Sequence, residues 1–149
     1  VKQPRAVVDK LAASLVPGGV FVAHEYINYA TWRLLPPSPD FESFVSEVIA
    51  SWRADGGEPD IGLQLPTWVE HSGFQIQSLR PIMDVLTPAD ALWAWPEAFL
   101  RVGLERLVSL GRFGPARSAE ILRDFERRKA QPGTRWVTPL VLEIIAVRH

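Results

Sequence analysis

Residues 15–23, Leu-Val-Pro-Gly-Gly-Val-Phe-Val-Ala, determine the fold expected for the sequence on either side of them. Upstream of this stretch, apolar residues recur at spacings of three and four, which predicts one buried face of a helix that begins at Pro4: Val8, Leu11 and Leu15. The Pro-Gly-Gly sequence then ends the helix. The apolar run at residues 20–23 does not alternate with polar residues, which favours a strand buried on both faces of a parallel sheet flanked by helices.

Further along, the pattern alternates between helices and short strands. Ser38 is a suitable N-cap for a strongly amphipathic helix that ends at Gly56. A short helix over residues 66–73 precedes a strand at 74–77. Residues 87–110 predict a helical region that is interrupted or kinked at Pro96. A last helix begins near residue 115, and residues 136–147 are rich in strand-forming side chains.

Composition excludes several classes of function. The chain has 149 residues, 47% of them apolar and 22% charged, which is typical of one globular domain. It contains no cysteine, so disulfides, thiolate zinc sites and cysteine nucleophiles are excluded. The net charge of -1 gives no global field for nucleic acid, and no apolar stretch is long enough for a membrane span. No metal site is expected, and the default location is cytoplasmic.

Three segments together resemble class I S-adenosylmethionine-dependent methyltransferases. The helix and Leu-x-Pro-Gly-Gly turn leading to residue 20 resemble the approach to that family's fifth strand. Residues 65–74, Leu-Pro-Thr-Trp-Val-Glu-His-Ser-Gly-Phe, are similar to the helix before its sixth strand, and residues 140–147 resemble its seventh. The resemblance implies an α/β fold: the three-stranded C-terminal part of a Rossmann-like methyltransferase sheet, with helical insertions at residues 27–60 and 87–132.

The glycine-rich loop that holds the cofactor in this family has no counterpart, because no three glycines fit Gly-x-Gly-x-Gly. The acidic residue that binds the cofactor ribose is absent as well. The chain also begins at Val1 without an initiator methionine. We therefore expect residues 1–149 to be one substrate-side portion of a larger domain that lacks its cofactor-binding half. The strand at residues 20–23 should then have one open edge, which invites self-association.

Candidate site residues follow from the rule that ligands bind beyond the carboxyl ends of strands in open α/β sheets. His24 and Glu25 lie just after residues 20–23, where a His–Glu pair could take a proton from a substrate. The alternative is that both only cap the strand end. Aromatic residues on the insertions could form an apolar substrate wall or simply pack on the sheet: Tyr26, Tyr29, Trp32, Trp93 and Trp95.

The expected function is therefore S-adenosylmethionine-dependent methyl transfer to a small, fairly apolar molecule by the intact protein, with this portion inactive alone. Two other functions remain open. The chain could be a non-enzymatic module that binds an apolar ligand, or a degenerate methyltransferase-like subunit that assembles with a cofactor-binding chain.

Overall fold

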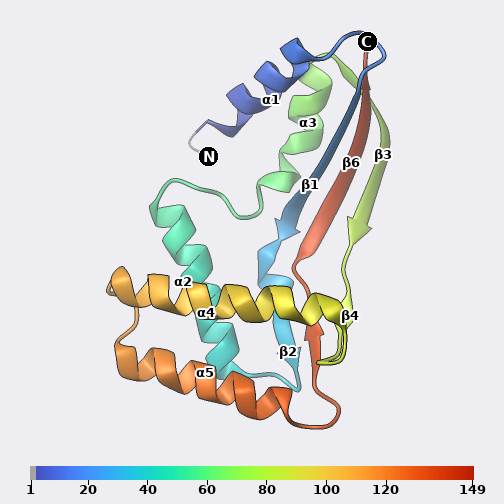
Figure 1. The fold of residues 1–149 in the computed structure, drawn as a ribbon. Helices are drawn as coiled ribbons and strands as arrows, with labels where there is room; N and C mark the ends of the chain where they lie inside the picture. The colour runs from blue at the N-terminus through green and yellow to red at the C-terminus, as the bar shows by residue number, and fades with distance from the viewer. Residues whose placement is uncertain (1–2) are drawn as a thin grey trace. The chain divides into compact units, whose positions relative to one another are not determined.

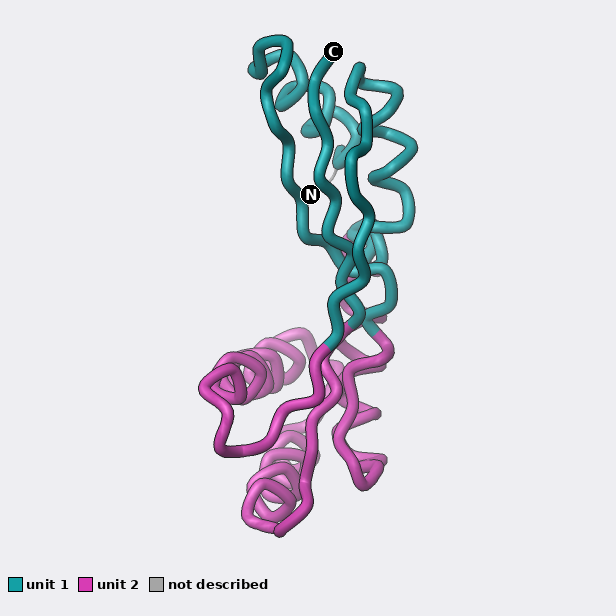
Figure 2. The backbone as a smooth tube through the Cα atoms, turned by 90° about the vertical axis from the view of Figure 1, so that its right-hand side faces the viewer, with its two compact units in different colours: residues 1–29, 56–83, 140–149 teal, residues 30–55, 84–139 magenta. Residues whose placement is uncertain are grey.

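The computed structural model describes residues 3–149, which form two compact units (Figure 2). Unit 1 comprises the residues up to Tyr29 together with Gly56–Met83 and Leu140–His149. Unit 2 comprises Ala30–Asp55 and Asp84–Pro139, and so takes in most of the two stretches predicted to be insertions. Each unit has its own small antiparallel sheet and its own helices, so the observed class is α/β.

Unit 1 is built on a three-stranded sheet whose middle strand comes last in the sequence. Its elements are α1 (Pro4–Ser14), β1 (Val20–Asn28), η2 (Ile61–Leu63), α3 (Leu65–His71), β3 (Phe74–Ile82) and β6 (Leu140–Arg148). The strand order is β1-β6-β3, and β6 is antiparallel to both neighbours. The strands predicted at three separate places in the sequence thus belong to one sheet.

The prediction of a parallel first strand covered on both faces is wrong. β1 is an edge strand, antiparallel to β6. Val20 and Val22 are each 57% exposed, whereas Phe21 and Ala23 pack against the core. An alternation of inward and outward residues was therefore present but hidden, because all four side chains are apolar.

The core of unit 1 lies between the sheet and the two helices on one of its faces (Figure 1). Val8 and Ala12 from α1, and Val69 from α3, meet Ile144 and Ala146 of β6 there. Each of these side chains is at most 4% exposed. The predicted helix face is correct at Val8, but it is centred on Val8 and Ala12, so Leu11 is 46% exposed.

Unit 2 packs three longer helices around a second small sheet. Its elements are η1 (Tyr29–Thr31, which starts in unit 1), β2 (Arg33–Leu35), α2 (Pro39–Ala54), β4 (Val85–Leu86), η3 (Ala91–Trp93), α4 (Ala94–Ser109), α5 (Pro115–Lys129) and β5 (Arg135–Val137). The strand order is β2-β5-β4, with antiparallel pairing throughout. Pro96 lies in the first turn of α4, where its missing N–H costs little, so it does not kink the helix.

A buried polar link ties two helices of unit 2 together. The Ser38 hydroxyl oxygen accepts a hydrogen bond from the Phe41 amide and so caps α2, as predicted. The same hydroxyl donates to the Asp124 carboxylate on α5 at 2.6 Å. Arg128 donates to that carboxylate at 2.7 Å, and Arg127 pairs with it too. A single side chain therefore begins one helix and fixes its contact with another.

Candidate functional site

The carboxyl end of β1 lies further along the chain than the sequence pattern suggests. β1 continues to Asn28, because His24, Glu25 and Tyr26 extend the ladder with β6. His24 and Glu25 are consequently in the middle of a strand. The residues at its end are instead Asn28 and Tyr29. The rule that ligands bind beyond carboxyl ends describes parallel sheets, so in this antiparallel pairing it does not by itself select this end.

His24 belongs to a row of polar side chains that crosses the whole sheet of unit 1. Its Nε2 lies 2.8 Å from Glu143 Oε2 on the middle strand. Arg80 on β3 donates from Nε to the other Glu143 oxygen at 3.0 Å. The Glu143 side chain is 14% exposed, whereas those of His24 and Arg80 are 54% and 64% exposed. One nearly covered carboxylate therefore joins two basic groups from opposite edge strands.

The partners of Glu143 keep it ionised. The hydrogen bond from Arg80, and after it the one from His24, hold the pKa of the Glu143 carboxyl below its ordinary value. An ionised carboxylate is an acceptor only. The His24 Nε2 is consequently the donor in its bond to Glu143, and its Nδ1 points to no protein partner that the described residues provide.

The structure does not bring His24 and Glu25 together as a pair. Successive side chains of a strand project to opposite faces, so Glu25 lies on the side of the sheet that carries the helices. His24 has Glu143 as its carboxylate partner instead. His71 is exposed, and its Nδ1 lies 2.6 Å from the Thr67 carbonyl oxygen.

Two tyrosines and a carboxylate organise the end of β1. The rings of Tyr26 and Tyr29 meet edge to face, with their centres 4.8 Å apart. The Tyr29 amide donates to Asp60 Oδ1 at 2.7 Å, and the Asp60 amide donates to the Glu58 carboxylate. The turn before η2 therefore fastens the end of the strand.

The two tyrosines are held in their protonated form. Burial raises the pKa of Tyr29 well above the ordinary range for a phenol, and the neighbouring Tyr26 adds to the effect. Burial also raises the pKa of Tyr26, with a further contribution from the charge of Glu25. Tyr29 is only 2% exposed, whereas Tyr26 is half-buried, so Tyr26 is the one of the pair that a ligand can reach.

Gly62 makes the closest approach at this end of the sheet. A Cβ atom at this position would lie 2.6 Å from the Tyr26 carbonyl oxygen and 2.9 Å from that of Glu25. Only glycine allows η2 to lie against the backbone of β1 at this distance. No role was predicted for Gly62 from the sequence. The one feature that could have indicated a close contact there is the glycine itself, two residues after Asp60.

The predicted aromatic wall separates into buried and exposed members. Trp32 and Trp93 are 1% and 2% exposed and pack against Trp136, at ring-centre distances of 5.5 and 5.4 Å. They form part of the core of unit 2, as in the packing alternative stated above. Trp95 is 51% exposed and is the member of this group that is open to solvent.

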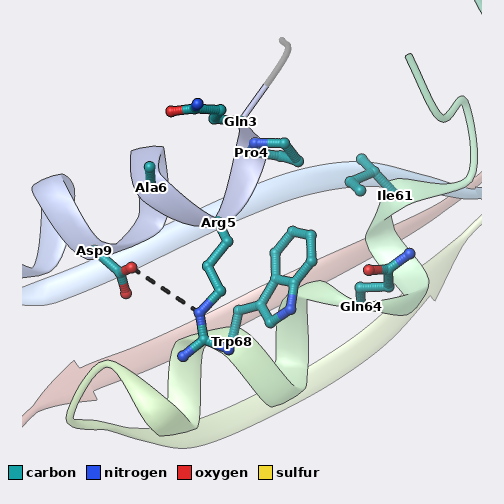
Figure 3. Close-up of a pocket in the computed structure, with 8 residues that line it drawn as sticks. All are labelled: Gln3, Pro4, Arg5, Ala6, Asp9, Ile61, Gln64 and Trp68. Carbon is teal, nitrogen blue, oxygen red and sulfur yellow. Dashed lines mark ion pairs between the residues drawn. The ribbon is translucent and has the colours of Figure 1, made fainter. Parts of the chain in front are cut away.

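A shallow cleft of about 590 Å³ lies at the N-terminal end of α1 (Figure 3). Figure 3 shows the indole of Trp68 in the middle of the cleft, between Arg5 and Gln64. Arg5 forms an exposed ion pair with Asp9 at 4.0 Å. Trp68 is half-buried, touching the core on one side and the cleft on the other. None of the residues predicted as site residues lines this cleft.

Metal and membrane features are absent from the described part of the chain. Within residues 3–149, no three His, Asp or Glu side chains gather in a way that could hold a metal ion. Among the same residues, no helix combines the length and apolar character needed to cross a bilayer.

Among the solved structures that match this chain are two described as methyltransferases, both at TM-scores below 0.5. One is described as a candidate methyltransferase from Bacillus halodurans, with a TM-score of 0.47 and 12% identity over 99% of this chain. The other is phosphoethanolamine N-methyltransferase 2 of Haemonchus contortus, bound to phosphomonomethylethanolamine and S-adenosylhomocysteine, with a TM-score of 0.37 and 15% identity. The chain spans 64% and 31% of the lengths of these proteins. No family model and no curated protein sequence matches the chain.

Proposed function

We propose that this chain is the substrate-side part of an S-adenosylmethionine-dependent methyltransferase that acts on a small, fairly apolar molecule. One observation carries the proposal. The Leu-x-Pro-Gly-Gly turn, the Leu-Pro-x-Trp helix and the last strand, which resemble that family in order, lead into or form the three strands of a single sheet. The helices of the first two segments, α1 and α3, also pack on the same face of this sheet (Figure 1).

The residues of this chain do not fit the cofactor by themselves. Five glycines have a positive φ, and each lies just beyond the C-terminal end of a helix: Gly18, Gly56, Gly73, Gly111 and Gly133. None is placed to form a glycine-rich loop between a strand and the start of a helix, which is how such loops bind a cofactor. We therefore propose that polypeptide outside these 149 residues binds S-adenosylmethionine, which supplies the methyl group.

The role of this chain in the proposed reaction is to position the methyl acceptor. Methyl transfer depends on aligning the acceptor with the methyl group, so rigid walls matter more than a reactive side chain. At the carboxyl end of β1, Tyr26 offers a half-buried protonated ring. The Tyr29 ring packs against the Tyr26 ring, and Gly62 lies close to the Tyr26 backbone carbonyl, so both contacts hold Tyr26 in place. We propose Tyr26 as part of the apolar wall for the acceptor.

Binding of tritiated S-adenosylmethionine tests the proposal. The 149-residue chain should show no saturable binding up to about 1 mM, the range of weak association, and the complete gene product should saturate at micromolar concentrations. Saturable micromolar binding by the chain alone would overturn the division of roles. Absence of binding by the complete product would overturn methyl transfer itself.

The acceptor wall is tested by transfer of the tritiated methyl group to a panel of apolar phenols, amines and carboxylic acids. In the complete product, Tyr26→Ala should lower transfer while leaving cofactor binding unchanged. Tyr26→Phe is the matched control, because it keeps the ring and removes only the hydroxyl group. Transfer by Tyr26→Ala at the rate of the unsubstituted protein would remove Tyr26 from the site.

A further inference from the structure

His24 has one ring nitrogen that is bonded and one that is available. Its Nε2 lies 2.8 Å from a Glu143 oxygen, and its Nδ1 makes no hydrogen bond to any described residue. The side chain is 54% exposed, which leaves room for a ligand at this nitrogen. His71 shows the contrast, because its Nδ1 lies 2.6 Å from the Thr67 carbonyl oxygen. Of these two histidines, only His24 can therefore offer Nδ1 to a ligand.

Glu143 determines which nitrogen of the neutral His24 ring carries the proton. Arg80 donates from Nε to the second carboxylate oxygen at 3.0 Å, and its positive charge balances that of the carboxylate. The hydrogen bonds from Arg80 and His24 hold the pKa of the Glu143 carboxyl below its ordinary value, so this group can only accept. In a neutral imidazole one nitrogen donates and the other accepts. The proton is therefore on Nε2, and the lone pair on Nδ1 is an acceptor that points in a fixed direction.

Tyr26 is the neighbour of His24 on the same face of β1. The ladder with β6 is regular from Val20 to Tyr26, and side chains two residues apart in a strand point to the same face. The step between the two residues is about 6.7 Å. Tyr26 is half-buried, and its ring meets the Tyr29 ring edge to face at 4.8 Å. A hydrogen-bond acceptor and a fixed aromatic ring thus lie side by side on one strand.

These two neighbours select a hydroxyl group on an aromatic ring. The lone pair of Nδ1 needs a donor, and it repels a carboxylate, which only accepts. Arg80, which would attract a carboxylate, is on the opposite edge strand, two strand spacings or about 9.6 Å away. An alkylammonium group donates but has no lone pair for a new bond. A hydroxyl group donates its proton and keeps lone pairs, and an aromatic ring packs favourably on the ring of Tyr26.

We propose that Nδ1 of His24 receives the hydroxyl proton of a phenol whose ring packs against Tyr26. The inference rests on the proposed methyl transfer and names its acceptor as a phenol, rather than an amine or a carboxylic acid. The O–H bond breaks, its electron pair stays on the oxygen, and the proton forms an N–H bond at Nδ1. The exposed imidazolium then releases this proton to water. His24 is thus a catalytic residue, and Glu143 is a positioning residue that fixes the ring.

The protonation of the His24 ring can be tested without any methyl donor. The complete gene product is labelled with ¹⁵N-histidine, and NMR at a pH where the ring is neutral shows which nitrogen carries the proton. The spectrum of His24→Gln assigns the signal. The proton should be on Nε2, and Glu143→Gln should abolish this preference, because an amide side chain can donate as well as accept. A proton on Nδ1 in the unsubstituted product would overturn the proposal.

Transfer of the tritiated methyl group to two phenols tests the role of Nδ1. At mildly alkaline pH, 4-ethylphenol keeps its proton, whereas 4-nitrophenol is already ionised. His24→Gln keeps an amide near the position of Nε2, for the bond to Glu143, and removes Nδ1. It should lower kcat/KM for 4-ethylphenol by about 100-fold, as for loss of a general base. The value for 4-nitrophenol should stay nearly unchanged, because no proton has to be removed. His71→Gln is the matched control and should change neither value.

Binding of tritiated S-adenosylmethionine by each variant separates this inference from the proposed function. Binding by His24→Gln should equal that of the unsubstituted product. With normal cofactor binding, equal losses for the two phenols would overturn the role of His24 alone. Preferential transfer to amines or carboxylic acids would also overturn it and leave methyl transfer in place. A complete product that binds no cofactor would instead overturn methyl transfer, and this inference with it.

Discussion

Replacing Gly62 by alanine should destabilise unit 1 more than any other single methyl group added near the end of β1. The new Cβ would lie 2.6 Å from the Tyr26 carbonyl oxygen and 2.9 Å from the Glu25 carbonyl oxygen. Ordinary contact for such atoms begins at 3.4 Å, so η2 and β1 must separate by about 0.8 Å. Both oxygens belong to the backbone of a paired strand, so neither can turn aside as a side chain could.

The cost follows from this geometry. Overpacking by one methyl group costs about 1–3 kcal/mol, and rigid neighbours favour the upper half of that range. For a unit of this size, a loss of about 2–3 kcal/mol lowers the melting temperature by roughly 10–20 °C. The hydrogen bond from the Tyr29 amide to Asp60 should weaken too, because it joins the same two segments.

Calorimetry measures the melting temperature, and amide hydrogen exchange assigns the loss to β1 and η2 rather than to unit 2. Leu63→Ala is the matched control in the same turn. That side chain is 65% exposed, so its removal should change the free energy of unfolding by less than about 0.5 kcal/mol. A Gly62→Ala protein as stable as the Leu63→Ala protein would refute the role of the close approach.

Three further substitutions test unit 2. Burial raises the pKa of Asp124, but hydrogen bonds from Ser38 and an arginine outweigh it, so the pKa lies below the ordinary 3.8. Its contribution to stability is full above that value and is lost as the pH falls through the folded-state pKa, so Asp124→Asn should destabilise at pH 7 and converge with wild type in acid urea titrations. Gly103→Ala places a Cβ 2.8 Å from the Phe44 ring and should cost about 1–3 kcal/mol in urea unfolding; an unchanged midpoint would contradict the packing. Trp93→Ala should cost about 3–5 kcal/mol by the same measurement, because the side chain is 2% exposed; a smaller loss would show that the ring is not part of the core.

Helices were the most predictable part of this chain, because their ends are encoded locally. Ser38 with Pro39 marks the start of α2, and Gly56 and Gly73 mark the ends of α2 and α3. A cap is a contact between residues three or four apart, so it can be read without knowing the rest of the fold. Pro96 was harder to interpret, because a proline can lie in the first turn of a helix or interrupt the middle of one; here it lies in the first turn of α4.

Strand pairing was less predictable, because it depends on residues far apart in the sequence. β2 and β4 have only three and two residues, too few for a periodic pattern, and both exist because they pair with β5. The run of apolar residues in β1 gave no sign of which face was exposed.

The candidate site shows the same limit. His24 was predicted as a site residue, but its carboxylate partner in the structure, Glu143, lies 119 residues away in the sequence. Adjacency in sequence suggested Glu25 instead, although neighbours in a strand point to opposite faces. Predicting the row of His24, Glu143 and Arg80 requires the register of three strands, which single-sequence patterns do not contain.

The position of β6 has a consequence for how this protein is made. Within the described residues, β1 and β3 do not pair with each other, and in this sheet each pairs only with β6. On a ribosome, both edge strands therefore emerge long before residues 140–148 exist to join them, while the segments of unit 2 are complete by Pro139. The segments of unit 2 therefore leave the ribosome before β6 does, and the sheet of unit 1 closes only after β6 has emerged. Until that moment two unpaired strands are exposed to chaperones and to aggregation.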